Sequence, residues 1–486
     1  MDQSSAPILE ALVAYRERGD INYTPPGHKQ GRGVDERVLA VLGRDLFAAD
    51  VMTNNGLDDR LQTHEVLATA QRLMADAVGA EHAFFSTCGS SLSVKTLMIS
   101  VAGPEEKLLI NRNAHKSVVS GIIIAGIQPV WIEPRWDEEL HLTYPPGADT
   151  VAETLSGHVD AKGVLVVTPT DYGTCADLAA ITDVCHQQGK PFLVDEAWGA
   201  HLPFHPDLPQ WAMDAGADAC VTSVHKMGSG LEQSSVFHLQ GERIDPSVLS
   251  QREDMLGTTS SSPLIYAALD GWRRQMAEHG HDLLTAALAL AHETREAIDA
   301  LPGLTVLGER LLGPQRAADT DPLKIVIDVS ELGISGYQAV DWLHNERHIN
   351  LALADHRRMT LALTHADSHE TTGPLLDGLR ALTEAADRLP RAKPVTLPTP
   401  KELRLELAML PRDAFFGRAE QVPAEQAVGR VAAEMLTPYP PGVPAVLPGE
   451  VINEAVVEYL RTGLAAGMTI PDAADAELKT VRVHAG

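Results

Sequence analysis

Cysteine is scarce in this sequence, and long apolar runs are absent. The four cysteines, Cys88, Cys175, Cys185 and Cys220, form no Cys-x-x-Cys pair. We therefore expect no disulfide framework, no zinc site and no other metal site. No stretch of eighteen uncharged apolar residues occurs, and the charged N-terminus lacks the apolar region of a signal peptide. These absences predict a cytoplasmic protein with no membrane segment.

Basic residues are also in short supply. Lysine and arginine together number 39 against 66 aspartates and glutamates, which gives a net charge of −27. A surface of that sign argues against binding to nucleic acid or to anionic membranes. It mildly favours the approach of a cationic small molecule, although acidity by itself also serves solubility. Only eleven of the 486 residues are lysines, so a lysine in an unusual setting stands out.

Strands and helices alternate along most of the chain. Short β-forming runs occur at residues 82–86, 107–111, 128–133, 163–168, 191–194 and 217–223, with helical stretches between them. This alternation predicts an α/β protein with a doubly wound, mostly parallel sheet. Two helices, 264–279 and 281–301, are then expected to lead into a smaller α/β domain. The predicted domains are an N-terminal helix and loop segment (1–55), a large domain (56–300), the small domain (301–392) and a C-terminal domain (393–486).

Lys226 lies where a predicted strand gives way to a turn rich in glycine and serine. The strand includes Cys220 and Val221, and the turn holds His225 and Lys226. Ligands of open α/β sheets bind beyond the carboxyl ends of the strands. A lysine at such a place can act as a nucleophile toward carbonyl groups and form a Schiff base. The alternative is an ordinary loop lysine, and this stretch alone does not decide between the two.

Other polar groups follow other predicted strands. The turn before the predicted helix 92–101 holds Ser90 and Ser91, which either bind a phosphate at the helix N-terminus or cap the helix. His115 opens a helix, and Asp195 ends a strand, where it could also be a helix cap. A loop at 22–33, rich in proline and glycine, carries His28 and is either held against a site or floppy.

Together these groups match the needs of pyridoxal 5′-phosphate (PLP). This cofactor requires a lysine for its aldehyde, a carboxylate for its pyridine nitrogen, a phosphate cradle and a group stacked on its ring. Lys226, Asp195, the Ser90-Ser91 turn and His115 supply one of each. Asp195 is preferred to Glu196 because it ends the strand directly. The sequence therefore predicts a PLP enzyme.

At this point the sequence resembles a known family, the Orn/Lys/Arg decarboxylases, in a short form without the N-terminal wing domain. Segments 24–33, 111–117, 194–201, 223–226, 259–264 and 427–450 carry the resemblance. The last, with its Tyr-Pro-Pro-Gly and Pro-Gly-Glu strings, is the most specific. The resemblance implies a PLP-dependent transferase-like fold (fold type I) with a C-terminal α+β unit. One departure is Cys88, which stands where the family commonly has asparagine in the phosphate turn.

The resemblance also implies a role for each matching residue. The three catalytic residues would be Lys226, which would hold PLP as an aldimine, His115, which would stack on its ring, and Asp195, which would pair with the ring nitrogen. The residues expected to contact the phosphate are Ser90, Ser91, Ser223, His225 and, toward the partner subunit, Ser261. Trp198 would line the cofactor pocket, unless it is a core residue. The expected substrate-binding residues are Glu450, which could instead be an exposed turn carboxylate, and His28.

The implied function is decarboxylation of a basic L-amino acid, with arginine giving agmatine and carbon dioxide in polyamine biosynthesis. Lysine and ornithine are alternative substrates, and a PLP aminotransferase or amino-acid oxidase is an alternative class. A non-catalytic protein of the same fold is a third reading, against which the intact Lys226 and Asp195 speak. We also expect a homodimer or a higher homo-oligomer with active sites at the subunit interface.

Overall fold

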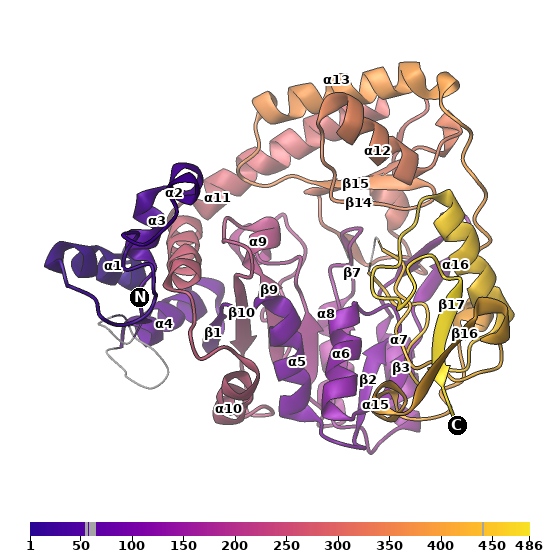
Figure 1. Cartoon of the computed structure of the whole chain (residues 1–486), viewed down its shortest axis with the longest axis horizontal. Helices are drawn as coiled ribbons and strands as arrows, with labels where there is room; N and C mark the ends of the chain where they lie inside the picture. Colours follow the sequence, from indigo (N-terminus) through magenta and orange to yellow (C-terminus); the bar gives the residue numbers. More distant parts are fainter. Residues whose placement is uncertain (54–56, 58–64, 440–441) are drawn as a thin grey trace. The chain divides into compact units, whose positions relative to one another are not determined.

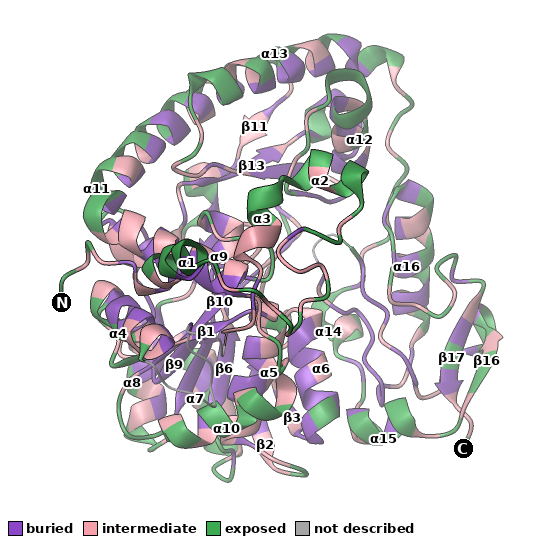
Figure 2. Cartoon of the chain, turned by 60° about the vertical axis from the view of Figure 1, so that its left-hand side comes forward, coloured by how far each residue is buried: buried purple, intermediate pink, exposed green. Residues whose placement is uncertain are grey.

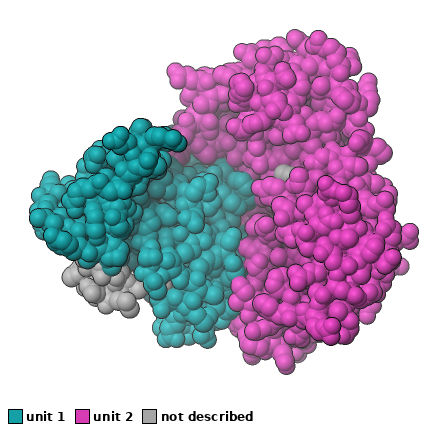
Figure 3. Space-filling model, in the orientation of Figure 1, with its two compact units in different colours: residues 1–100, 193–284 teal, residues 101–192, 285–486 magenta. Residues whose placement is uncertain are grey.

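The computed structural model describes residues 1–53, 57, 65–439 and 442–486, which form two compact units (Figure 3). The first unit comprises residues 1–100 and 193–284, and the second comprises 101–192 and 285–486. Helices and strands alternate in both, and the central sheet is mixed and mostly parallel. The predicted α/β class is therefore confirmed. Among the described helices, none combines the length and the apolar character that spanning a bilayer requires.

Four strands of the first unit lie in the order β1-β10-β9-β8, with bounds His82–Ser86, Ser235–Leu239, Ala219–Ser223 and Phe192–Asp195. β8 and β9 are parallel, whereas β10 is antiparallel to both β9 and β1. The register pairs Ser86 with Ser235 and Ser235 with Ser223. The carboxyl ends of β1, β9 and β8 therefore lie at one edge of the sheet, as the sequence analysis expects. The helices of this unit include α1 (Pro7–Arg18), α2 (Glu36–Leu42), α3 (Arg44–Ala49), α4 (Val66–Val78), α5 (Gly89–Val101) and α10 (Pro246–Leu256).

The segment that carries Lys226 is a single helical turn and not the loose turn that we predicted. Helix α9 (Val224–Met227) follows β9 without a break. Gly228 ends this turn, and a Cβ atom there would lie 2.6 Å from the Trp272 indole nitrogen. The close approach of the Trp272 ring explains why the residue that ends the turn is glycine.

Two predicted helices are in fact one. Helix α11 runs from Pro263 to Asp299 over 37 residues, so the expected interruption near Gly280 is wrong. A Cβ atom at Gly280 would lie 3.2 Å from the Phe204 Cβ atom and 3.1 Å from the Met276 Cε atom. This glycine therefore serves close packing inside a continuous helix, where it costs about 1 kcal/mol relative to alanine.

The N-terminal segment is fixed to α11 by a fully buried ion pair. The Arg273 and Asp270 side chains are both inaccessible to solvent and lie 2.7 Å apart. Arg273 also donates to the backbone oxygens of Gln3 and Ser5, and Asp270 accepts from the Ile8 amide. These bonds tie the start of α1 to α11. By contrast, α2 and α3 contain no buried residue, and Figure 2 shows α2 largely in the colour of exposed residues.

The second unit contains three parallel strands in the order β6-β2-β3, with bounds Val164–Val167, Lys107–Asn111 and Gln128–Ile132. Its helices near these strands are α6 (Lys116–Ala125), α7 (Ala148–Gly157) and α8 (Leu178–Gln187). A hairpin of β4 (Arg135–Asp137) and β5 (Leu142–Tyr144) also forms here. The sequence pattern did not predict this hairpin, since three-residue strands give too short an alternation to recognise.

This unit also contains a second sheet, which has four strands. Its order is β11-β13-β15-β14, with bounds Thr305–Val306, Lys324–Asp328, Arg358–Ala362 and Leu353–Ala354. Helices α12 (Gly336–Arg347) and α13 (His369–Ala385) lie on one side of it, as Figure 1 shows. The remaining short strands, β7 (Thr174–Cys175) and β12 (Asp319–Thr320), pair with each other.

The C-terminal part of the chain has a core of its own. It consists of α14 (Pro400–Leu403), α15 (Pro411–Phe416), α16 (Glu454–Ala466) and the antiparallel pair β16 (Ala419–Pro423) and β17 (Thr480–His484). Its buried apolar side chains form one cluster, in which Leu436, Val446 and Leu460 are almost inaccessible to solvent. The buried Glu434 carboxylate accepts from the Ala474 and Arg482 amides and so joins distant parts of this segment.

Candidate active site

Lys226 and Trp198 lie together at the carboxyl edge of the first unit's sheet. The Nζ atom of Lys226 is 4.4 Å from the centre of the Trp198 ring. Lys226 comes from the helical turn after β9, and Trp198 comes from the turn after the parallel neighbour β8. A cation held over an indole ring is stabilised by the partial negative charge of the π face, which arises from the ring quadrupole. The structure thus gives Trp198 a polar contact in addition to any packing role.

Asp195 is the last residue of β8, and this residue is 4% exposed. One carboxylate oxygen accepts from the Ala197 amide at 3.3 Å. No α-helix among the described elements begins at Asp195, so it is not a helix cap. The neighbouring Glu196 is fully buried, and desolvation raises its pKa well above the ordinary value. The Glu196 carboxyl group is thus driven toward the protonated form.

The turn after β1 brings hydroxyl groups to the N-terminus of a helix. Helix α5 begins at Gly89, three residues earlier than predicted, so Ser90 and Ser91 lie in its first turn and do not precede it. The Ser223 hydroxyl donates to the Ser90 hydroxyl at 2.5 Å. Gly89 has φ +76°, a backbone conformation that favours glycine. Backbone N–H groups and serine hydroxyls at a helix N-terminus are the usual ligands of a phosphate.

Three further predicted site residues of the first unit are His225, Ser261 and His28. His225 bonds through Nδ1 to the Ser234 backbone oxygen at 3.1 Å. Ser261 is partly exposed in the turn before α11. His28 uses both ring nitrogens, one with the Asp50 carboxylate at 3.1 Å and one as acceptor from the Gly31 amide. The loop around His28 is therefore held by its own bonds.

His115 lies in the second unit, where it caps helix α6. Its Nδ1 atom accepts from the Ser117 amide at 3.2 Å and lies 2.9 Å from the Ser117 hydroxyl. The C-terminal segment passes next to the ring, since a Cβ atom at Gly442 would be 3.4 Å from the ring carbon Cδ2. The Gly442 oxygen also accepts from the Lys116 amide. The ring orientation is thus set by both the helix N-terminus and this distant glycine.

Glu450 is also in the second unit, and it is inaccessible to solvent. It is therefore not the exposed turn carboxylate that we considered as an alternative. Its Oε2 atom lies 3.2 Å from the Arg112 guanidinium and accepts from the Leu447 amide at 2.8 Å. Desolvation raises the pKa of Glu450, and Arg112 partly opposes that shift. Arg112 lies in the motif at 111–117, but no role was predicted for it.

Two family models match the chain. The model of the major domain of Orn/Lys/Arg decarboxylases matches residues 6–310, and that of their C-terminal domain matches residues 401–475. The chain belongs to the Orn/Lys/Arg decarboxylase family. The residues described above belong to the motifs on which the family resemblance rests. The cofactor of the family, PLP, accounts for a lysine and an acid at adjacent strand ends.

Individual relatives extend over nearly the whole chain. An arginine decarboxylase of Halalkalibacterium halodurans is 38% identical over 99% of this chain and 98% of its own length. The solved structure of the constitutive lysine decarboxylase of Escherichia coli superposes with a TM-score of 0.82 at 22% identity, over 99% of this chain and 82% of that one. A serine palmitoyltransferase of Sphingomonas wittichii gives a TM-score of 0.54 at 16% identity, over 76% and 86%. These two structural likenesses confirm the predicted fold.

Proposed function

We propose that this protein is a PLP-dependent decarboxylase whose substrate is L-arginine and whose products are agmatine and carbon dioxide. The observation that carries the proposal is the position of Lys226, in the helical turn that follows β9 and against the Trp198 ring, one strand from the buried Asp195. The similarity to an arginine decarboxylase over nearly the whole chain favours arginine over lysine and ornithine.

The residues of the first unit fit PLP. Lys226 offers an amine to the aldehyde, and Asp195 offers a buried carboxylate to the ring nitrogen. Ser90, Ser91 and Ser223 offer hydroxyl groups to the phosphate at the N-terminus of α5. When bound, the cofactor supplies an electron-withdrawing ring that weakens the bond between the substrate Cα atom and its carboxylate.

Three side chains then have defined tasks. Asp195 would pair with the cofactor's ring nitrogen and would keep a proton there. Lys226 would hold the cofactor through its amine, and the same amine would deliver the proton that replaces carbon dioxide at the substrate Cα atom. Trp198 restricts the positions of the Lys226 amine through the contact at 4.4 Å. The carbon–carboxylate bond breaks and a carbon–hydrogen bond forms, so one proton is taken up for each carbon dioxide released.

The remaining assignments stay predictions. We propose that His115 stacks on the cofactor ring, that His225 and Ser261 contact phosphate groups, and that Glu450 and His28 recognise the substrate. We also propose the four domains at 1–55, 56–300, 301–392 and 393–486, and a cytoplasmic location, which the scattered cysteines favour.

We further propose a homodimer with active sites at the subunit interface. Support comes from the N-terminal segment, which exposes several large apolar side chains: Val13 (54% exposed), Ile21 (76%), Tyr23 (91%) and Val41 (82%). Large apolar side chains that are exposed in a contiguous patch commonly mark a protein interface. Sedimentation of the purified protein tests this, because a monomer at micromolar concentration would contradict it.

Parallel incubations test the function. The purified protein with PLP is given arginine, lysine or ornithine without any keto acid, and products are identified by mass. We expect agmatine and carbon dioxide from arginine, at a rate well above that with the other two amino acids. Faster release of carbon dioxide from lysine or ornithine would show that the preferred substrate is that amino acid and not arginine. Formation of a keto acid or of peroxide without carbon dioxide would replace the decarboxylase by an aminotransferase or an oxidase.

A further inference from the structure

The loop between β2 and α6 carries both Arg112 and His115. The Arg112 side chain is 13% exposed, and His115 is partly buried. Both residues contact a distant stretch of the second unit, residues 442–450, which we call the C-terminal loop. Arg112 contacts its later part and His115 contacts its first residue, so the C-terminal loop meets the β2–α6 loop at two points.

Arg112 binds the C-terminal loop through several acceptors. Its guanidinium donates to the Pro444 oxygen at 2.8 Å and to the Ala445 oxygen at 3.2 Å. It also lies 3.2 Å from the Glu450 Oε2 atom, which accepts from the Leu447 amide. A guanidinium presents its donors in a rigid planar fork, which an ammonium group does not. One side chain therefore fixes the course of the C-terminal loop.

Gly442 brings the C-terminal loop to the His115 ring. This glycine is buried and has φ +91°, a backbone conformation that favours glycine. Its oxygen accepts from the Lys116 amide at 3.2 Å. A Cβ atom at Gly442 would lie 3.4 Å from the Cδ2 atom and 3.5 Å from the Nε2 atom of His115, which is van der Waals contact. The loop thus approaches the ring with its backbone alone.

Helix α6 holds the other side of the same ring. The Nδ1 atom of His115 accepts from the Ser117 amide at 3.2 Å and lies 2.9 Å from the Ser117 hydroxyl. Nδ1 lies across the imidazole from the Cδ2–Nε2 bond. An Nδ1 atom that accepts from an amide carries no proton, so the neutral ring carries its proton on Nε2. The ring is therefore held by α6 on one side and by Gly442 on the other.

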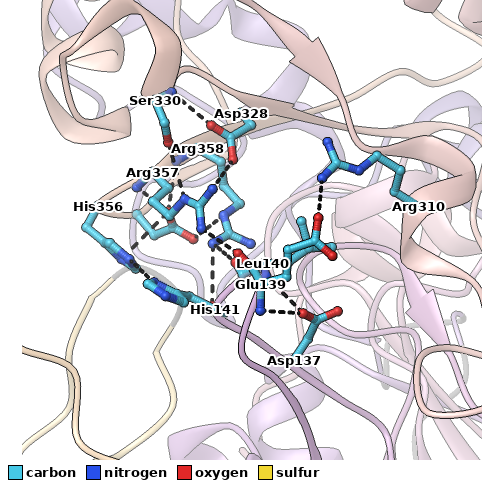
Figure 4. A network of polar contacts seen from close by, with 11 residues as sticks. Asp137, Glu139, Leu140, His141, Arg310, Asp328, Ser330, His356, Arg357 and Arg358 are labelled. Atoms are coloured by element: carbon cyan, nitrogen blue, oxygen red, sulfur yellow. Dashed lines mark hydrogen bonds and ion pairs between the residues drawn. The ribbon is translucent and has the colours of Figure 1, made fainter.

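The β2–α6 loop also has a firm support in the β4–β5 hairpin. Asn113 donates to the Thr143 hydroxyl of β5 at 3.5 Å. Figure 4 shows Arg357 and Arg358 reaching the backbone of the turn between β4 and β5, where Arg357 donates to the Glu139 oxygen at 2.7 Å. The hairpin, the four-stranded sheet and the C-terminal segment pack together, since all three line one cavity. The hairpin therefore limits the movement of the β2–α6 loop.

We propose that Arg112 is a positioning residue for His115. By holding the C-terminal loop at residues 444, 445 and 450, Arg112 keeps Gly442 beside the ring and so sets the plane of the imidazole. This inference rests on the proposed function, in which His115 stacks on the cofactor ring. Stacking requires one fixed ring plane, and a misplacement of about 1 Å can cost roughly 10²-fold in rate.

NMR of the full-length protein as purified tests this link without any substrate. Histidine is labelled with ¹³C at Cε1, and the His115 signal is the one that His115→Asn lacks, since asparagine still caps α6. We expect Arg112→Lys to shift the His115 signal beyond its linewidth. Lysine keeps a positive charge beside the Glu450 carboxylate but loses the planar fork. An unshifted His115 signal in an Arg112→Lys protein that retains a cooperative thermal transition would overturn the proposal.

Arg430→Lys is the matched control for that substitution. The Arg430 guanidinium also binds a carboxylate and a backbone oxygen, those of Glu420 and His484, and among the described residues it makes no side-chain bond to the C-terminal loop. We expect it to leave the His115 signal in place. An equal shift in Arg430→Lys would show a general effect of arginine loss and would overturn the proposal.

Two glycine variants test the contact at the ring itself. Gly442→Ala places a methyl group against His115, whereas at Gly429, which has φ +80°, a Cβ atom would have no other atom within 4 Å. The two substitutions therefore share the backbone strain and differ in the ring contact. We expect Gly442→Ala to move the His115 signal and Gly429→Ala to leave it unchanged. Equal signals in the two variants would contradict a role for Gly442.

Rates with arginine show whether the positioning matters for the reaction. We expect kcat to fall about tenfold in Arg112→Lys and in Gly442→Ala, because each displaces the ring. Neither change should lower kcat further in a His115→Asn protein, since the group that they position is then absent. Losses that multiply in the double variants would overturn the proposal. A wild-type protein that releases no carbon dioxide from arginine, lysine or ornithine would contradict the proposed function instead, and the NMR comparison would still decide the role of Arg112.

Discussion

The amine of Lys226 lies over the Trp198 indole, 4.4 Å from the ring centre. The two residues follow neighbouring parallel strands, so the sheet itself brings them together. The contact holds a nucleophilic amine at the strand edge, where ligands of this kind of sheet bind. This arrangement leads to the first two predictions.

Replacing Lys226 by alanine should abolish the covalent attachment of PLP. We expect the visible absorbance of the bound cofactor to be lost after dialysis and activity to fall by at least ~10²–10⁴-fold, because the group that transfers the proton is gone. Lys190→Ala is the control, since that amine bonds only to the Val159 oxygen among the contacts of the described chain. Borohydride should abolish the visible band of the control and leave its reduced cofactor attached through dialysis, whereas Lys226→Ala should retain no cofactor. Activity near the wild-type value in Lys226→Ala would contradict the assignment of Lys226 as the residue that binds PLP and transfers the proton.

Trp198→Leu should weaken the hold on the Lys226 amine without removing the nucleophile. A cation–π contact is worth about 0.5–2 kcal/mol, so we expect kcat/KM to fall roughly 2–30-fold. Trp198→Phe keeps an aromatic face and should lose less. Steady-state rates with arginine measure both variants. If the leucine and phenylalanine variants lose equally, packing and not the ring face explains the role of Trp198.

Asp195 and Glu196 offer a matched pair of substitutions. Asp195→Asn removes the negative charge at the strand end, and we expect kcat to fall by about 10²-fold or more, as for the loss of other groups that stabilise charge at a reacting centre. Glu196→Gln should leave kcat within a factor of about three, because burial already favours the neutral form of that side chain. Comparable losses in both variants would show that the assignment of Asp195 over Glu196 is wrong.

Stability should respond to pH through Glu196. Burial raises its pKa well above the ordinary value of 4.5, so the folded protein keeps a proton that the unfolded chain releases as the pH rises past 4.5. The free energy of unfolding therefore falls with rising pH, by up to about 1.4 kcal/mol per pH unit from this group. Glu196→Gln removes that contribution. We expect its melting temperature to match the wild type near pH 4.5 and to exceed it at pH 8. A difference that does not grow with pH would contradict this account.

Glu450 and Arg112 allow a structural role to be separated from substrate recognition. Breaking a buried ion pair by removing one partner costs about 3–5 kcal/mol, so Arg112→Met should lower the denaturation midpoint strongly. Arg112→Met combined with Glu450→Gln should recover much of that loss, since no buried charge is then left alone. If Glu450 also recognises substrate, Glu450→Gln raises KM for arginine several-fold. An unchanged KM would leave Glu450 with a purely structural role.

Much of the first unit's site could be predicted because its chemistry lies at strand ends. Asp195 ends an apolar run, Ser90 and Ser91 follow another, and Lys226 follows a third. Parallel strands in one sheet place such ends at the same edge, so local pattern and topology suffice. The errors are also local in origin. Gly280 suggested a break between two helices, but the helix continues through it and the glycine packs close to Phe204. The helical turn at Lys226 is too short to show a helical period in the sequence.

The sequence by itself determined the alternation of strands and helices, the family motifs and the position of Lys226 among serines and glycines. Each of these features depends only on residues that are close together in the chain. Only the tertiary structure decided that Arg112 pairs with Glu450, 338 positions away, and that His141 stacks on His356. Those contacts depend on how three parts of the second unit pack, and no periodicity in the chain encodes which distant side chains will meet. The same packing encloses a cavity of about 210 Å³ whose lining includes Tyr172, Tyr337 and Tyr459, three residues that are far apart in the chain.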